Sequence, residues 1–234
     1  MALTDWLISY WKFDEGSWTT AFDSVEDNDW SIIGATWTTG KINNWLSFDW
    51  VDDYVDMGDF YPVIWSNARS CFARIKTTNS TDNKCIMEWG SHNNSERWQI
   101  RLDPTELRLE VAGDWATGTT QLDNGIWHYV WVTYDWSWTL SGAKLWVDWN
   151  IELDISSSQS VNTGTNHGID IWRDPALGNN LYFDWLIDEV WIWNRALTSS
   201  EVSELYNNWD WLQYWQPWFW WDVIKRTNIF FRNN

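Results

Sequence analysis

The sequence predicts an all-β protein, a two-sheet antiparallel jelly-roll sandwich with one short C-terminal helix. Many short segments alternate apolar and polar residues with period two, which is typical of half-buried strands. Turn-forming residues separate these segments at short intervals, as in sandwiches of packed sheets. The chain has 234 residues, enough for one large core. We therefore expect one domain over residues 1–211, and a tail, a linker or the start of a truncated module over 212–234.

The N-terminal half of the predicted domain opens with a strand over residues 5–14, in which Trp11 and Phe13 share one face. A polar turn region follows, and further strands are expected at 30–33 and 45–49.

A half-buried strand is predicted over residues 71–76, with its hairpin partner at 85–89 and the turn around 79–82. Cys71 and Cys85 flank this hairpin. With the turn centred near Ser80, the two cysteines are not opposite one another, so a disulfide is possible but is not the default expectation.

The middle of the chain predicts two neighbouring strands, 97–102 and 107–111, that bury one face and present the other, polar face to solvent. Residues 128–134 form the next core edge, followed by a hairpin of 144–147 and 151–155. A polar loop and a short strand at 169–172 then lead to the closing elements.

The closing elements are a strand over 183–193 and a short helix. Val190 and Ile192 fall on one face of the strand, with tryptophans on the other. The period then changes: Thr198 is predicted to cap a helix with Glu201 reaching back to it, as in a capping box. A helix of about two turns is too short to be stable without packing partners.

The run FDWLIDEVWIWNRALTSSEV at 183–202 resembles the C-terminal signature of the LamG-like branch of the concanavalin A-like lectin/glucanase superfamily. Three further phrases of that family occur in its order: YWKFDEG at 10–16, LSFDWVDDYV at 46–55 and WHYVWVTYD at 127–135. The resemblance covers residues 5–208 and implies a concanavalin A-like sandwich in which the first strand pairs with the closing one.

Charge and hydropathy exclude two classes of partner. A net charge of -18 and a pI near 4.3 argue against nucleic acid and anionic membranes, which need clustered lysine and arginine. No apolar run predicts membrane insertion, and no signal segment opens the chain. We expect an extracellular, cell-surface or virion-associated protein that is exported by another route, is carried on a larger particle, or is represented here by a fragment.

The 27 tryptophans are far more than ordinary usage, and several stand where a turn is expected. Asp-Trp occurs at Trp50, Trp136, Trp149 and Trp185, where the family phrases have glycine, the residue that accepts positive φ. One hypothesis is that these are UGA codons of a lineage that reads UGA as glycine; the alternative is a truly tryptophan-rich surface. The same hypothesis covers Trp18, Trp30, Trp45, Trp115 and Trp209.

The residues do not predict an enzyme. Some glucanases of the superfamily carry a Glu-x-Asp-x-Glu-like motif, and Glu152-Leu153-Asp154-Ile155 resembles its first half, but serines follow where the second glutamate is needed. His92, His128 and His167 are far apart in the sequence and show no metal-ligand spacing.

A structural Ca²⁺ is expected from the resemblance, at the meeting point of the first and last strands. Asp188 shares the parity of Val190 and Ile192 along the strand, so its carboxylate is expected to point to the packed side and to need a partner. Asp14 would lie near it, and calcium prefers such oxygen ligands. The alternative is that Asp188 accepts backbone N–H groups without a metal.

A glycan site is expected on the polar sides of the central strands, where hydrogen-bonding side chains accompany an aromatic platform; loops at the rim and a plain solvated face are the alternatives. The candidate residues are Gln99, Arg101, Arg108, Glu110, Tyr129 and Thr133. We therefore expect a non-catalytic adhesion or recognition module for a glycan or cell-surface ligand. The second candidate is a structural or decoration domain of a viral or cell-surface assembly, and the third is a glycoside hydrolase.

Overall fold

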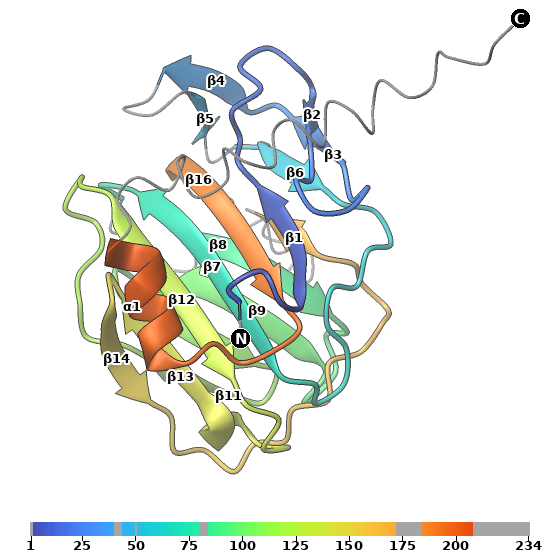
Figure 1. Ribbon diagram of the computed structural model, residues 1–234, viewed down its shortest axis with the longest axis vertical. Coiled ribbons are helices and arrows are strands. Elements are labelled where there is room, and N and C mark those ends of the chain that lie inside the picture. Colours follow the sequence, from blue (N-terminus) through green and yellow to red (C-terminus); the bar gives the residue numbers. More distant parts are fainter. Residues whose placement is uncertain (1, 40–43, 50, 80–83, 172–183, 208–234) are drawn as a thin grey trace, which may run out of the picture. The chain divides into compact units, whose positions relative to one another are not determined.

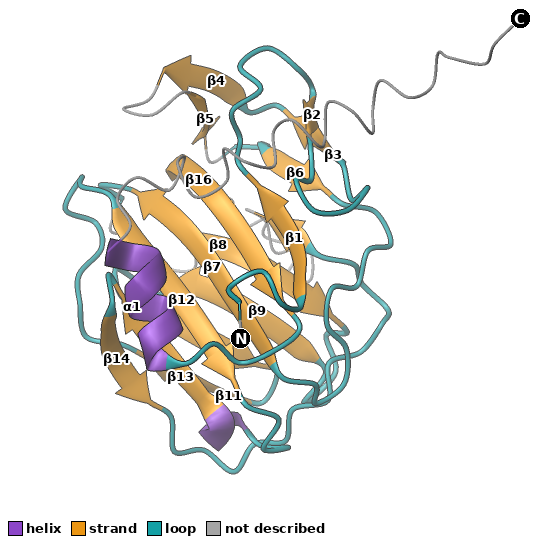
Figure 2. Cartoon of the chain, in the orientation of Figure 1, coloured by secondary structure: helices purple, strands orange, loops and turns teal. Residues whose placement is uncertain are grey.

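The computed structural model describes residues 2–39, 44–49, 51–79, 84–171 and 184–207. The chain divides into two compact units, Met1–Leu197 and Thr198–Asn234. Strands dominate the first unit, and in the described part of the second the regular structure is one helix (Figure 2). No helix in the described residues is long and apolar enough to cross a membrane.

The first unit consists of two antiparallel sheets, which confirms the predicted all-β sandwich. Sheet A has the strand order β14-β13-β12-β7-β16-β5-β4, with β1 paired to β16, and sheet B has the order β11-β10-β9-β8-β15-β6-β3-β2. The strands of sheet A are β1 (Leu7–Trp11), β4 (Thr36–Thr39), β5 (Asn44–Asp49), β7 (Arg69–Lys76), β12 (His128–Tyr134), β13 (Ala143–Val147), β14 (Asn150–Asp154) and β16 (Asp184–Trp193). Those of sheet B are β2 (Thr20–Ala21), β3 (Trp30–Ile33), β6 (Tyr54–Asp56), β8 (Lys84–Gly90), β9 (Arg97–Leu102), β10 (Leu107–Val111), β11 (Asp114–Thr117) and β15 (Asp170–Ile171).

The two sheets pack face to face around one apolar core. Figure 1 shows β7, β12 and β16 in front of β8 and β9. Alternate residues of each strand fill the space between the sheets, for example Val130 and Val132 from β12 and Ile100 and Leu102 from β9. The opposite side chains of the same strands lie on the outer faces, where the candidate sites are found.

The first and last strands of this unit lie side by side, as predicted. β1 pairs antiparallel with β16, with Trp11 opposite Val190. The strand ends at Trp11, before the predicted limit of 14, and Phe13 has a φ of 56°. Trp11 and Phe13 are both fully buried in the core.

The predicted hairpin of 71–76 and 85–89 is wrong. β7 pairs with β12 and β16 in sheet A, whereas β8 pairs with β9 and β15 in sheet B. Alternation of polar and apolar residues assigns a face to each side chain but does not assign a strand to a sheet. Cys71 and Cys85 are consequently in different sheets, and both are buried thiols rather than halves of a disulfide.

A β-bulge in β16 overturns the predicted parity of Asp188. The register with β7 shifts between Asp188 and Trp191, and Glu189 has a φ of 54°. Ile187 and Val190 therefore both face the core, and Asp188 lies opposite Arg74 on the outer face of sheet A.

In the second unit, α1 (Ser199–Asn207) begins with the predicted capping box. The Thr198 amide donates to Glu201 Oε2 at 2.8 Å, and the Glu201 amide donates to Thr198 Oγ1 at 3.3 Å. The predicted tail over 212–234 lies outside the described residues.

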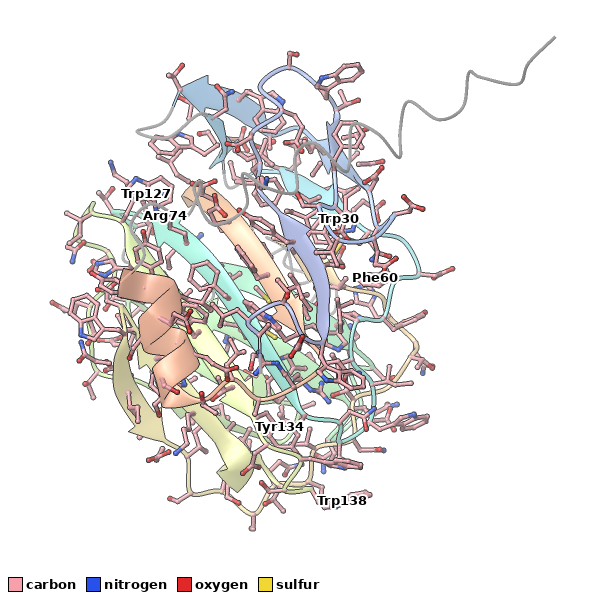
Figure 3. The ribbon with its side chains drawn as sticks, viewed as in Figure 1. Trp30, Phe60, Arg74, Trp127, Tyr134 and Trp138 are labelled. Carbon is pink, nitrogen blue, oxygen red and sulfur yellow. The ribbon has the colours of Figure 1, made fainter. Side chains whose placement is uncertain are left out.

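Five exposed tryptophans have positive φ, the region that favours glycine. They are Trp6, Trp65, Trp136, Trp138 and Trp149, with φ between 57° and 131°. Figure 3 shows Trp138 at the rim of the molecule. The expected turn positions Trp136 and Trp149 are confirmed as positive-φ sites.

Other tryptophans assigned to glycine-like positions are not at positive φ. Trp30 lies in β3 and Trp45 in β5, and both are buried; Trp185 is paired with Phe48 inside β16. The prediction of turns at these three positions is therefore wrong. Trp115 lies in β11, and Trp18 also has a negative φ. Trp50 and Trp209 lie outside the described residues.

Candidate functional site

The outer face of sheet B carries the polar side chains predicted on β9 and β10. Antiparallel pairing places Arg108 opposite Arg101 and Glu110 opposite Gln99, so four of the six predicted ligand-binding residues are neighbours. We call this surface the arginine face; it comprises Arg97, Gln99, Arg101, Arg108 and Glu110.

Glu110 holds the arginine face together because three guanidinium groups converge on its carboxylate. Arg101 Nη2 lies 2.9 Å and Arg108 Nη2 lies 2.7 Å from Glu110 Oε2, and Arg97 contacts Oε1. Arg108 also pairs with Asp103. These charge-assisted contacts fix the planar side chains in one arrangement.

The arginine face is packed, which corrects the prediction that β9 and β10 present a polar face to solvent. Gln99 is fully buried, and Arg97, Arg101 and Arg108 are each less than one-tenth exposed. Burial lowers the pKa of Arg101, and the charge of Glu110 opposes that shift. Such buried charges are tolerated because each arginine has a carboxylate partner.

Trp115 adds an exposed aromatic ring to the arginine face. It lies on β11 directly opposite Glu110, and the Arg108 guanidinium carbon lies 4.4 Å from its ring centroid. The side chain is 56% exposed. An exposed ring beside rigid hydrogen-bonding groups is the combination that binds the apolar face of a sugar together with its hydroxyls.

Tyr129 and Thr133 do not belong to this arrangement. Both lie on β12 in sheet A, on the outer face of the other sheet. The Tyr129 ring lies 5.6 Å from the Arg74 guanidinium, and Thr133 Oγ1 accepts a hydrogen bond of 3.1 Å from Trp146 Nε1. The predicted glycan site is therefore divided between the two sides of the sandwich.

Asp188 is partnered by an arginine rather than by backbone amides. Arg74 Nη1 lies 3.1 Å from Asp188 Oδ2, and the same guanidinium lies 4.5 Å from the Trp127 ring, beside which Figure 3 draws it. Burial raises the pKa of Asp188 well above its usual value, the charges of Glu189 and Asp14 add to the rise, and the charge of Arg74 opposes it.

These surroundings fit a calcium ion poorly. The guanidinium of Arg74 already neutralises Asp188, and a second cation at that carboxylate would meet its repulsion. Among the described residues, Asp14 and Asp188 are not part of a group of three side-chain ligands gathered within 4.8 Å. Calcium there stays a prediction; a calcium titration tests it, because bound calcium would raise the melting temperature of wild type but not of Asp188→Asn.

Glu152, the residue of the glucanase-like motif, serves as a hydrogen-bond acceptor in the structure. Its carboxylate accepts from the amide and hydroxyl groups of both Thr119 and Thr120. Partial burial alone would raise its pKa, but the four hydrogen bonds outweigh burial and lower it. A carboxylate held ionised in this way is poorly suited to donate a proton to a leaving group.

A further cluster, which no spacing in the sequence indicates, lies at the edge of the arginine face; we call Glu88, His92 and His167 the histidine cluster. Gln99 Nε2 donates to Glu88 Oε2 at 2.7 Å, and Glu88 lies together with His92 and His167, one ligand atom from each being within 4.8 Å of the others. Spacing could not reveal it, because His92 and His167 come from separate loops. A second group, Asp49, Asp52 and Asp53, is entirely acidic.

A family model of the concanavalin A-like lectin/glucanases superfamily matches residues 49–203. The chain belongs to this superfamily. No curated protein sequence matches it significantly. The match begins within β5 and ends within α1, so it includes the arginine face and the histidine cluster.

Solved structures agree with the superfamily fold. Domain 4 of AbnA, a GH43 extracellular arabinanase from Geobacillus stearothermophilus in complex with arabinotriose, is 21% identical with a TM-score of 0.64, over 85% of this chain and 97% of that one. The binding domain of Paraclostridial Mosquitocidal Protein 1 is 14% identical with a TM-score of 0.68, over 89% and 53%. The binding domain of Botulinum neurotoxin DC in complex with rat synaptotagmin II is 13% identical with a TM-score of 0.61, over 88% and 52%.

These likenesses concern the fold of this superfamily member. It spans nearly all of the arabinanase domain, about half of each toxin binding domain, and 33% of a Trypanosoma rangeli sialidase in complex with sialic acid, to which it is 13% identical over 87% of its own length with a TM-score of 0.60.

Proposed function

We propose that this superfamily member is a non-catalytic recognition module that binds a glycan or another surface ligand on the arginine face and the adjoining Trp115. The module acts outside the cell, on a cell surface or on a virion. The observation that carries the proposal is the exposed Trp115 ring, which lies beside guanidinium and carboxylate groups fixed by mutual ion pairs.

Rigidity is what makes this arrangement suited to binding. Long arginine side chains lose substantial conformational entropy when a ligand fixes them. Here Glu110 and Asp103 hold Arg108 already, so a ligand stacked on the exposed Trp115 ring meets a guanidinium that reaches the surface only at its edge and is preorganised. Planar polar side chains next to an aromatic ring match the alternating hydroxyl and apolar surfaces of a pyranose or furanose ring.

Three considerations support a module without catalysis. Glu152 is held ionised by four hydrogen bonds, and the glucanase-like phrase around it lacks a second glutamate. Two structures of similar fold are binding domains of toxins. The arabinanase structure holds arabinotriose in a domain of similar fold, which makes arabino-oligosaccharides the first probes to use.

A glycan array followed by calorimetry tests the proposal. Wild type is expected to bind a defined set of glycans, with arabinotriose and sialylated oligosaccharides among the probes. Trp115→Ala is expected to weaken binding by about fivefold, because an aromatic contact contributes about 1 kcal/mol. Trp18→Ala is the matched control, since Trp18 is similarly exposed and not part of the arginine face. Equal binding by the Trp115 variant and wild type would overturn the assignment of the site.

The alternative of a structural or decoration domain predicts a different result. Such a protein would show no glycan binding and would self-associate, which size-exclusion chromatography with light scattering detects. The exposed tryptophans, including Trp6, Trp65 and Trp138, favour this alternative only if they are tryptophan in the native protein.

A further inference from the structure

We propose that Glu88, His92 and His167 form a binding site for a divalent transition-metal ion of the zinc type. One ligand atom from each of the three side chains lies within 4.8 Å of the other two. Glu88 is fully buried on β8, His167 is partly exposed and His92 is exposed, so the cluster runs from a buried carboxylate to the surface.

The backbone that carries the two histidines is tied together. The Gly90 amide donates to the carbonyl of His167 at 2.9 Å, and the amides of Ser91 and Gly164 donate to the carbonyl of Glu96 at 3.0 Å and 2.9 Å. Gly90 has a φ of +105°, and a Cβ there would lie 2.1 Å from the Glu96 oxygen. Only glycine fits this approach, which keeps the loop bearing His92 beside the loop bearing His167.

Two of the three side chains are also oriented by hydrogen bonds. Gln99 Nε2 donates to Glu88 Oε2 at 2.7 Å, and His167 Nε2 lies 2.7 Å from Asp170 Oδ2. When His167 donates its Nε2 proton to Asp170, the lone pair of Nδ1 is free to bind a metal. Metal-binding histidines almost always bond a carboxylate, carbonyl or water through the other ring nitrogen in this way.

The donor set selects the class of metal. Two imidazoles and one carboxylate suit Zn²⁺ and its neighbours in the first transition series, whereas Ca²⁺ and Mg²⁺ prefer oxygen ligands alone. Tetrahedral donors around zinc are about 3.4 Å apart, given zinc–ligand distances near 2.1 Å. Separations of at most 4.8 Å exceed that spacing by no more than roughly 1.4 Å, which the exposed His92 ring can supply by rotation.

The site is separate from the proposed glycan contacts, which depend on Trp115 and Arg108. Gln99 connects the two, since it is opposite Glu110 in one direction and Glu88 in the other. Because the metal ligands and Trp115 are different residues, the metal and the glycan can be tested independently.

Isothermal titration of chelator-treated protein with ZnCl₂ tests the proposal, and CaCl₂ is the comparison ion. Wild type is expected to bind one Zn²⁺ per chain and to bind it at least about tenfold more tightly than Ca²⁺ at the same stoichiometry. His92→Ala and His167→Ala are each expected to weaken Zn²⁺ binding by about tenfold or more, as is Glu88→Gln. Titration with CoCl₂ supplies a second readout, because the ligand-field absorption of Co²⁺ reports nitrogen and oxygen coordination directly.

Two control variants separate this site from general attraction of cations to an acidic protein. Asp52→Asn removes the same charge as Glu88→Gln from the acidic cluster of Asp49, Asp52 and Asp53, and His128→Gln removes the remaining histidine. Both are expected to bind Zn²⁺ as wild type does. The exposed His92 variant keeps the test decisive if Glu88→Gln fails to fold. Absence of saturable Zn²⁺ binding below about 1 mM, or unchanged affinity in the His92 and His167 variants, would overturn the proposal.

Discussion

At the scale of single residues, two sets of tryptophans contrast in burial and backbone conformation. Trp89 and Trp98 are fully buried at negative φ, whereas each of the five tryptophans at positive φ is exposed. A residue with a Cβ loses roughly 1–2 kcal/mol of stability when its backbone adopts the left-handed region, and glycine does not. The coincidence of exposure and positive φ supports the hypothesis that some of these codons encode glycine in the source lineage.

Replacing tryptophan by glycine at positive φ is expected to stabilise the protein. Trp149, with a φ of 131°, and Trp136, with a φ of 72°, are the test positions. Trp149→Gly and Trp136→Gly are each expected to raise the free energy of unfolding by about 1 kcal/mol, measured by urea denaturation. The buried control Trp98→Gly is expected to lower it by about 3–5 kcal/mol. Loss of stability at both test positions, or tryptophan in the native protein by mass spectrometry, would contradict the hypothesis.

Glu189 makes stability depend on pH. Burial raises its pKa to about 7, a hydrogen bond from Tyr10 opposes the rise, the charge of Asp14 adds to it, and the charges of Lys12 and Arg74 oppose it. The unfolded carboxyl titrates near 4.5, so the folded state holds a proton that the unfolded state releases. The associated stability is complete below about 4.5 and is lost as the pH rises through about 7.

Glu189→Gln separates this contribution from that of other groups. The variant mimics the protonated side chain, so we expect it to match wild type in urea denaturation at pH 5 and to exceed wild type at pH 8. Burial also raises the pKa of Asp188, so this residue contributes part of the pH dependence of stability in both proteins. Parallel pH profiles for the two proteins would show that Glu189 does not titrate in this range.

At the scale of elements, the bulge in β16 determines what Asp188 contacts. It places Asp188 opposite Arg74 on β7 instead of in the core. Arg74→Met leaves this carboxylate buried without a charged partner, and we expect the free energy of unfolding to fall by about 3 kcal/mol. The double variant Arg74→Met/Asp188→Leu is expected to recover most of that loss, because it removes both charges. If the changes in the free energy of unfolding caused by the two single substitutions simply add in the double variant, the two side chains are not coupled.

Sequence patterns predicted the positions of single strands better than they predicted which strands pair with one another. Alternation in 97–102 and 107–111 located β9 and β10 and the side chains that face the core, because adjacent strands joined by a short turn pair locally. The same reasoning failed for β7 and β8, since the chain between them crosses from one sheet to the other. The predicted face of Asp188 was wrong because one extra residue in a strand, the bulge, reverses the face on which the preceding side chains lie.

At the scale of the whole molecule, the sites depend on long-range juxtaposition that spacing does not encode. His92 and His167 meet because β15 is inserted beside β8, with Asp170 opposite Glu88. Tyr129 and Gln99 were predicted to share a face but are separated by the thickness of the sandwich, because β12 and β9 are in different sheets. The resemblance to the superfamily supplied the fold, and the register of the strands was needed to define the candidate sites.

The pairing of the first strand with the last in the sandwich is expected to be essential for cooperative folding. β1 covers the part of β16 that contains Trp191, whose ring lies 3.8 Å from that of Tyr10, and it places Trp11 in the core. Removing residues 2–13 exposes an unpaired edge of β16 and leaves a cavity where Trp11 and Phe13 were.

We expect the chain that lacks residues 2–13 to lose the sharp urea transition and the near-ultraviolet circular dichroism of wild type, since a loss of several kcal/mol approaches the total stability of a domain. Removal of residues 212–234 is the matched control and, by the predicted domain boundary, is expected to leave both signals unchanged. If the chain without its first strand unfolded at the wild-type urea concentration, β16 would be held by β5 and β7 alone, and the pairing of the terminal strands would have no part in cooperativity.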